Sequence, residues 1–140
     1  MRSFLGIALF GAVMLVGSAA GAQTPGPFSR DQVNDGRKGF AENCAACHGS
    51  DLSGVEAPAL TGKIFTDHWG GKNTAEFYKY IQTNMPMCHG GVLGNAAYAE
   101  LVAFLLWANG AEPGANDFDG KTEVSVSSIA SGKLRANLGK

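Results

Sequence analysis

Apolar side chains recur with the spacing of an amphipathic helix in three stretches of the chain. The first stretch runs from about Arg30 to Glu42, and its apolar face is formed by Val33, Gly36, Phe40 and Cys44. Ser29 stands directly before it as the expected N-cap, and an acidic residue in the first turn favours the helix dipole. A glycine inside a helix costs about 1 kcal/mol relative to alanine. Gly36 therefore marks either a close crossing of two backbones or a tolerated surface position.

The second stretch predicts a helix from about Thr74 to Asn84. Asn73 precedes it as an N-cap, and Glu76 lies at the position of a capping-box partner. Pro86 ends the helix, because the residue before a proline is held away from helical geometry. The apolar face of this helix consists of Phe77, Tyr80 and Ile81.

The third stretch predicts a helix from about Asn95 to Asn109, with Gly110 just past its end. Four apolar residues recur at helical spacing: Tyr98, Leu101, Val102 and Leu105. Three more broaden the stripe to most of the circumference: Phe104, Leu106 and Trp107. Such a helix has little polar face to offer to water, so it is expected to be heavily buried.

Between the first two helices, residues Gly49 to Gly71 show no sustained periodicity and contain five glycines. This stretch is expected to be a long functional loop. After Gly114 the apolar density falls; residues Thr122 to Ile129 alternate as a short strand would, but serine and glycine dominate. Residues 113–140 are accordingly expected to be an irregular tail. The predicted domain is all-α, spans residues 30–112, and follows an extended lead-in over 23–29.

The first 22 residues have a different character. Arg2 is followed by an apolar run from Phe4 to Val16 and by small residues up to Ala22. This pattern is typical of a secretory signal peptide, with cleavage expected after Ala22. A retained membrane anchor is the alternative, but the run is short for a hydrocarbon core that requires about 20 residues. No later stretch is long and apolar enough to span, so the expected location is the periplasm.

Composition narrows the classes of partner. The chain has 140 residues, which suffices for one domain. Charged residues make up 16% of it and the formal net charge is −1. No basic stripe is present, which argues against a nucleic-acid partner.

The three cysteines change the picture most. Cys44, Cys47 and His48 form the sequence C-x-x-C-H, the attachment motif of a c-type haem. Two thiols on one tight turn can reach the two vinyl groups of the porphyrin, and the next residue then places an imidazole under the iron. Cys88 is left over without a partner.

A C-x-x-C pair also occurs in two other kinds of site. A thioredoxin-like redox pair requires a preceding strand, and none is visible before Cys44. A structural zinc site requires a second pair of ligands. Cys88 and His89 could supply that pair, although two adjacent ligands suit tetrahedral geometry poorly.

From about Arg30 to Gly110 the chain resembles the class I c-type cytochromes. Gly36 and Phe40 stand where that family has a Gly/aromatic pair, which the resemblance implies packs on Phe104. Ala57-Pro58-Ala59-Leu60 is similar to the family's Pro-x-Leu, whose proline carbonyl receives a hydrogen bond from the proximal imidazole. Asn84-Met85-Pro86 resembles the segment that carries the second iron ligand. The resemblance implies a cytochrome c-like fold with three main helices around one covalently bound haem.

The sequence offers several donors for the second iron ligand. Met85 is preferred because the following proline holds it extended beside the end of a helix. The other candidates are His68, Met87, Cys88 and His89. Trp69 and His68 are further expected as donors to the haem propionates, with ordinary loop packing as the alternative. Lys63, Lys72 and Lys79 could form a weak docking ring.

These features predict a carrier of single electrons and not an enzyme. His48 and Met85 would close both axial positions, and thioether ligation gives the positive potential that suits passage from a dehydrogenase toward an oxidase. The stretch from Trp69 to Leu106 also looks like cytochrome modules that accept electrons from periplasmic quinoprotein alcohol dehydrogenases. An enzyme or sensor with an open iron site, and a thiol or metal-binding module without haem, remain as alternatives.

Overall fold

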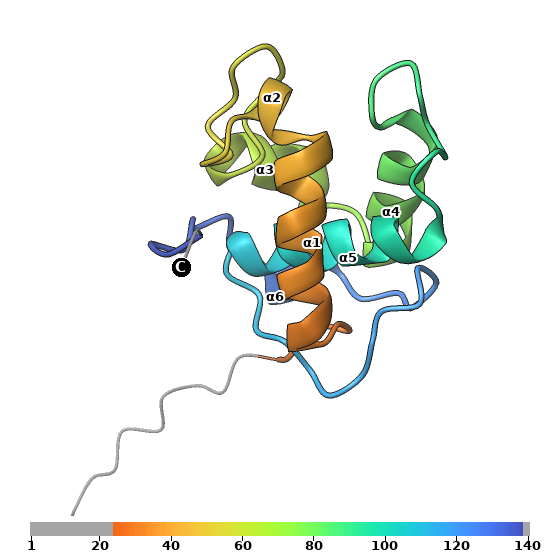
Figure 1. The fold of residues 1–140 in the computed structure, drawn as a ribbon. Coiled ribbons are helices and arrows are strands. Elements are labelled where there is room, and N and C mark those ends of the chain that lie inside the picture. The colour runs from red at the N-terminus through yellow and green to blue at the C-terminus, as the bar shows by residue number, and fades with distance from the viewer. Residues whose placement is uncertain (1–23, 139–140) are drawn as a thin grey trace, which may run out of the picture.

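The three helices that the apolar spacing predicts are present at nearly the predicted bounds. In the computed structural model, which describes residues 24–138, α1 spans Arg30–Asn43, α4 spans Thr74–Asn84 and α5 spans Asn95–Ala108 (Figure 1). Within that range there is no β-sheet, and the all-α fold class is confirmed. The predicted leader over residues 1–22 lies outside the described part of the chain.

Both predicted helix starts are capped as expected. The Ser29 hydroxyl accepts a hydrogen bond from the Gln32 N–H at 3.2 Å. The Asn73 side chain accepts from the Glu76 N–H at 2.8 Å, and the Glu76 carboxylate accepts from the Asn73 N–H at 2.9 Å. This reciprocal pair is a complete capping box, and it satisfies two backbone donors that the helix itself cannot pair.

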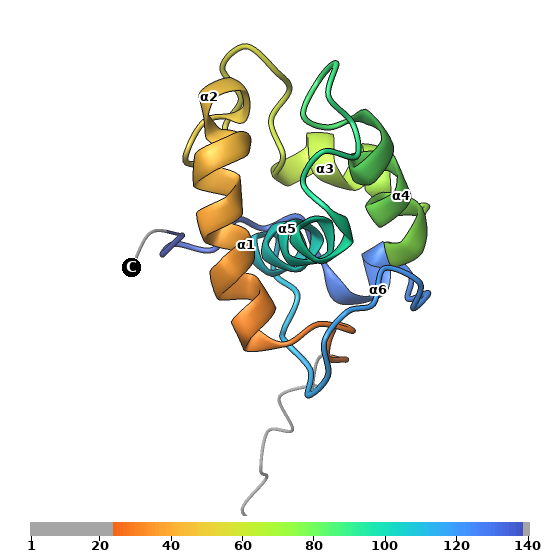
Figure 2. The same ribbon diagram turned by 45° about the vertical axis from the view of Figure 1, so that its right-hand side comes forward.

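The helices α1 and α5 cross at close range (Figure 2). Gly36 is buried in this crossing, and a Cβ there would lie 1.9 Å from the carbonyl oxygen of Glu100. One turn further on, the rings of Phe40 and Phe104 pack with centroids 5.4 Å apart. Of the two explanations for Gly36, the close crossing is correct.

Helix α5 forms the centre of the core. Every residue from Leu101 to Ala108 is buried, and Tyr98 is completely so. A helix that is apolar around its whole circumference can be stable only when other elements cover it on all sides. α1, α4 and the chain after Gly110 supply that cover.

The prediction of a continuous loop from Gly49 to Gly71 is wrong in its second half. An eight-residue helix, α3, spans Gly62–Trp69, and the single turn α2 spans Ala45–His48. The ring centroids of Phe65 and Trp69, four residues apart on one face, lie 5.8 and 4.3 Å from that of Phe77 on α4. Because Thr61 provides no side-chain cap for α3, this packing stabilises the helix in place of local signals.

The chain after Gly114 is irregular over most of its length, but it is packed onto the helices. It contains one short turn of helix, α6 over Val126–Ile129, and one isolated antiparallel bridge between Asn73 and Ser125. Phe118 is among its buried side chains. Among the helices of residues 24–138, none is long and apolar enough to cross a membrane.

Candidate functional site

A cavity of about 440 Å³ lies between the C-terminal end of α1 with α2, the loop that follows them, α4 and α5. This volume lies within the usual range of cofactor sites, about 300–1,000 Å³. Its wall is mainly apolar, and the larger apolar side chains in it are Phe40, Leu60, Trp69, Phe77, Ile81, Leu101 and Leu105. The loop after α2 and the segment after α4 rise on the same side of α5 (Figure 2). The cavity is thus large enough for a cofactor, and its lining suits an apolar one.

The C-x-x-C-H motif lies in the wall of this cavity. Cys44 ends α1 and begins α2, and its carbonyl accepts from the N–H groups of Cys47 and His48 at 3.2 and 3.0 Å. This one tight turn brings both cysteines and the imidazole to the same cavity. The arrangement fits a haem attached through two thioethers and ligated by the following histidine.

The imidazole of His48 is held in a defined orientation. It is 8% exposed, and its Nδ1 lies 2.9 Å from the carbonyl oxygen of Pro58. A carbonyl only accepts, so Nδ1 carries the proton and Nε2 is the nitrogen left for a metal. The hydrogen bond expected between these two residues is confirmed.

The loop that presents Pro58 is folded around the motif itself. The N–H groups of Val55, Glu56 and Ala57 all point to the carbonyl of Cys47, at 3.0–3.1 Å. The N–H of Gly54 donates to the carbonyl of His48 at 2.8 Å. These bonds fix the Pro58 carbonyl relative to the imidazole, so that the ring orientation is set by the backbone.

Burial changes the chemistry of the first cysteine. It raises the pKa of the Cys44 thiol to about 11, with a smaller contribution from the nearby Cys47. A thiolate is therefore strongly disfavoured at this position. A thioether carries neither proton nor charge, which suits this environment better.

Met85 is the preferred candidate for the second ligand, and it lines the cavity from the end of α4. Met87 also borders it but is 72% exposed. His68, Cys88 and His89 are exposed and do not belong to the wall. Of the five donors left open by the sequence, two methionines reach the cavity.

The structure supports neither of the two other uses of the cysteine pair, the thioredoxin-like redox pair and the zinc site. Cys44 is preceded by helix α1 and not by the strand that a thioredoxin-like motif requires. Over residues 24–138, no cluster of three or more His, Cys, Asp and Glu side chains could hold a metal ion. Cys88 and His89 are thus not gathered with Cys44 and Cys47 into a zinc site.

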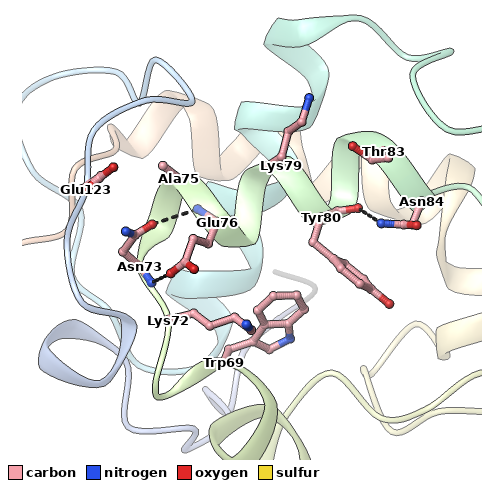
Figure 3. A pocket seen from close by; sticks show the side chains of 10 residues that line it. All are labelled: Trp69, Lys72, Asn73, Ala75, Glu76, Lys79, Tyr80, Thr83, Asn84 and Glu123. Carbon is pink, nitrogen blue, oxygen red and sulfur yellow. Dashed lines mark hydrogen bonds between the residues drawn. The ribbon is translucent and has the colours of Figure 1, made fainter.

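Trp69 and Tyr80 line both this cavity and a second, open groove of about 500 Å³. Figure 3 shows the side chains of that groove. The ring centroids of Trp69 and Tyr80 are 5.1 Å apart. Lys72 and Lys79 line the groove, as do Glu76 and Glu123, so its charges are balanced. The role of Trp69 as a propionate donor stays a prediction.

The lysines do not form a ring at the cavity. Lys63 pairs with Asp67 at 2.6 Å, while Lys72 and Lys79 lie in the adjoining groove. The other residues of the wall are mostly apolar positions of the predicted helices, such as Leu101 and Leu105. Their helical spacing marked them as buried but could not distinguish a cavity wall from ordinary core.

Comparison with known proteins agrees with this geometry. Residues 31–105 match the family model described as cytochrome c oxidase, cbb3-type, subunit III. The chain is 32% identical over 93 residues to a thiosulfate dehydrogenase of Stutzerimonas stutzeri (strain A1501), covering 59% of this chain and 29% of that protein. It is 48% identical over 48 residues to the cbb3-type cytochrome c oxidase subunit CcoP of Azospirillum brasilense, covering 34% and 15%.

The chain thus spans less than a third of the length of either relative. A solved structure, the sulfane dehydrogenase SoxCD from Paracoccus pantotrophus, overlaps with 95% of this chain and 70% of that one. Its sequence identity is 23% and the TM-score is 0.49.

Proposed function

The chain belongs to the family of c-type cytochrome domains described as cytochrome c oxidase, cbb3-type, subunit III, and on this basis we propose that it carries single electrons on a haem c ligated by His48 and Met85. Membership of the family implies the covalently bound haem. The assignment of residues rests on one observation. Cys44, Cys47, His48 and Met85 all line the same apolar cavity.

When bound, the haem would supply an iron that can accept and release one electron. Cys44 and Cys47 would anchor the group, and His48 would bind the iron through Nε2, because the Pro58 carbonyl accepts the hydrogen bond from Nδ1. The thioether of Met85 favours the reduced iron relative to an imidazole, so it raises the potential. The mainly apolar wall would keep water away from the iron, which would limit the rearrangement that accompanies electron transfer.

Two protein ligands would leave no iron position open to a substrate. The chain itself is therefore proposed to be a carrier and not an enzyme, although relatives such as thiosulfate dehydrogenase are enzymes as whole proteins. The enzyme or sensor with an open iron site is the competing function. It would require that neither Met85 nor Met87 binds the iron.

The relatives suggest the direction of electron flow. One is named as a dehydrogenase and another as an oxidase subunit. We propose that this chain takes electrons from a periplasmic dehydrogenase and passes them to a downstream cytochrome or oxidase of a respiratory chain. Export by the predicted leader over residues 1–22 would place it in the periplasm. The quinoprotein class of dehydrogenase stays a prediction from the sequence.

The test is a potentiometric titration of the haem-loaded chain, with the visible absorption spectrum as the readout. A carrier should give one reversible one-electron transition at positive potential, with a low-spin spectrum in both states. Carbon monoxide should bind the reduced form poorly. A high-spin ferrous form that binds carbon monoxide at once would favour the open-site enzyme and contradict the carrier.

A further inference from the structure

A buried tyrosine is hydrogen-bonded to the backbone of Met85, the proposed second iron ligand. Tyr98 lies in the first turn of α5 and has no exposed surface. Its hydroxyl donates a hydrogen bond of 2.7 Å to the carbonyl oxygen of Met85. The cytochrome function proposed above does not by itself require this contact.

Both backbone polar groups of Met85 are held in this way. Its N–H donates to the carbonyl of Ile81 at 2.9 Å, which ties it to α4. Its carbonyl is tied to α5 by Tyr98. The backbone of Met85, from which its side chain extends, is therefore fixed relative to two helices of the cavity wall.

The hydrogen bonds given for the residues that follow stay within the segment itself: the His89 N–H donates to the Pro86 carbonyl at 2.8 Å, and His89 Nδ1 lies 3.2 Å from the Met87 carbonyl oxygen. Met87, Cys88 and His89 are all exposed, and each carries a side chain that can bind iron. They lie within four residues of Met85, so a small displacement of the backbone would bring another donor to the cavity. Donor chemistry alone does not select Met85 among these four.

We propose that Tyr98 is a positioning residue that selects Met85 as the iron ligand and keeps the competing donors away. Its hydroxyl acts on the Met85 carbonyl and does not touch the iron. This inference rests on the proposed ligation by His48 and Met85. It explains why Met85 would be the ligand by a residue on α5, whereas Met85 itself lies at the end of α4.

The chain offers a matched control in Tyr78. This residue is also buried, and its hydroxyl also donates to a backbone carbonyl, that of Asn95 at 3.3 Å. It accepts a further bond from the Gln82 side chain at 3.1 Å. Tyr78→Phe and Tyr98→Phe thus remove the same group from two buried sites, and only one of those sites includes Met85.

The experiment compares the haem-loaded wild type with the two variants. The ferric spectrum reports the thioether-to-iron band, and titration with imidazole reports how readily the thioether is displaced. In Tyr98→Phe the band should weaken, and the affinity for imidazole should rise about three- to tenfold, the effect expected from losing one hydrogen bond. In Tyr78→Phe both should stay within about twofold of the wild type.

A thermal melt of each variant separates positioning from general stability. If both variants melt earlier but only Tyr98→Phe loses the band, the effect is specific to the ligand. A Tyr98→Phe protein with an unchanged band and imidazole affinity would overturn the inference alone. A wild type without a thioether band would overturn the ligation by Met85 together with it.

Discussion

Gly36 lies so close to the backbone of Glu100 that a Cβ added to it would stand 1.9 Å from the Glu100 carbonyl oxygen. The obstacle is the backbone of α5, which cannot rotate away as a flexible side chain could. Gly36→Ala should therefore force the two helices apart and lower the free energy of unfolding by about 3 kcal/mol. Denaturant unfolding of the haem-loaded protein measures this directly.

Gly39 is the control for that substitution. It lies in the same helix, but a Cβ there would meet only the Leu101 side chain, at an ordinary 3.7 Å. Gly39→Ala should stabilise the protein by about 0.5–1 kcal/mol, because alanine is the better helix former. Equal destabilisation by both substitutions would show that the close crossing is not the cause.

The haem is expected to complete the core. Without it the apolar cavity of about 440 Å³ would be left empty beside the core of a small domain. Cys44→Ser combined with Cys47→Ser should leave the exported chain unfolded, whereas Cys88→Ser should fold normally. Far-UV circular dichroism during heating is the measurement, and a cooperative, fully helical melt of the double variant would contradict this account.

Arg135 ties the C-terminal segment to the end of α5. Its guanidinium donates to the carbonyls of Trp107 and Ala111 at 2.8 and 3.0 Å and pairs with the Glu112 carboxylate. A cation at the C-terminal end of a helix satisfies carbonyls that have no partner in the helix. Arg135→Met should cost about 1–3 kcal/mol in an equilibrium unfolding experiment, while Lys133→Met, at an exposed position, should change little.

Asp119 makes the stability of the same C-terminal segment depend on pH. Hydrogen bonds from the N–H groups of Lys121 and Thr122, both 2.8 Å, lower the pKa of its carboxyl below the ordinary 3.8. A lowered folded-state pKa means that the ionised form stabilises the fold above that ordinary value. The stabilisation is lost as the pH falls through the folded-state pKa.

Asp119→Ala should consequently melt earlier than the wild type at pH 7, and the difference should shrink once the pH falls below about 4. Melting temperatures across this range provide the check. Asp117→Ala, two residues earlier and also exposed, is the comparison. A difference for Asp119→Ala that persists unchanged at pH 2–3 would show that the ionised carboxylate is not responsible.

The helices with strong local signals were predictable from the sequence. α1 and α4 have side-chain caps, and α5 has an uninterrupted apolar stripe, so their bounds follow from short-range physics. α3 was missed because it is short, uncapped and flanked by glycines. The only signal for it was the spacing of Phe65 and Trp69, four residues apart. Its stability comes from contacts with α4, which the sequence does not display.

The residues of the candidate site likewise fall into those that the sequence predicts and those that it does not. Cys44, Cys47 and His48 follow from a compact motif whose spacing already contains the chemistry. The contact from His48 to Pro58 followed only from a family resemblance, because it depends on the folding of the loop between them. The contact from Tyr98 to Met85 could not be predicted, since the apolar spacing that buries Tyr98 says nothing about what its hydroxyl meets.

The central claim is that Met85 would be the second protein ligand of the iron beside His48, and a comparison of the ferric spectra of the wild type and Met85→His tests it most directly. The wild type should be low-spin with a thioether-to-iron band. Met85→His should stay low-spin, lose the band and have a lower potential, because imidazole stabilises the oxidised iron. Met87→Leu should retain both features. A wild type without the band, or a band that disappears in Met87→Leu and survives in Met85→His, would contradict the account.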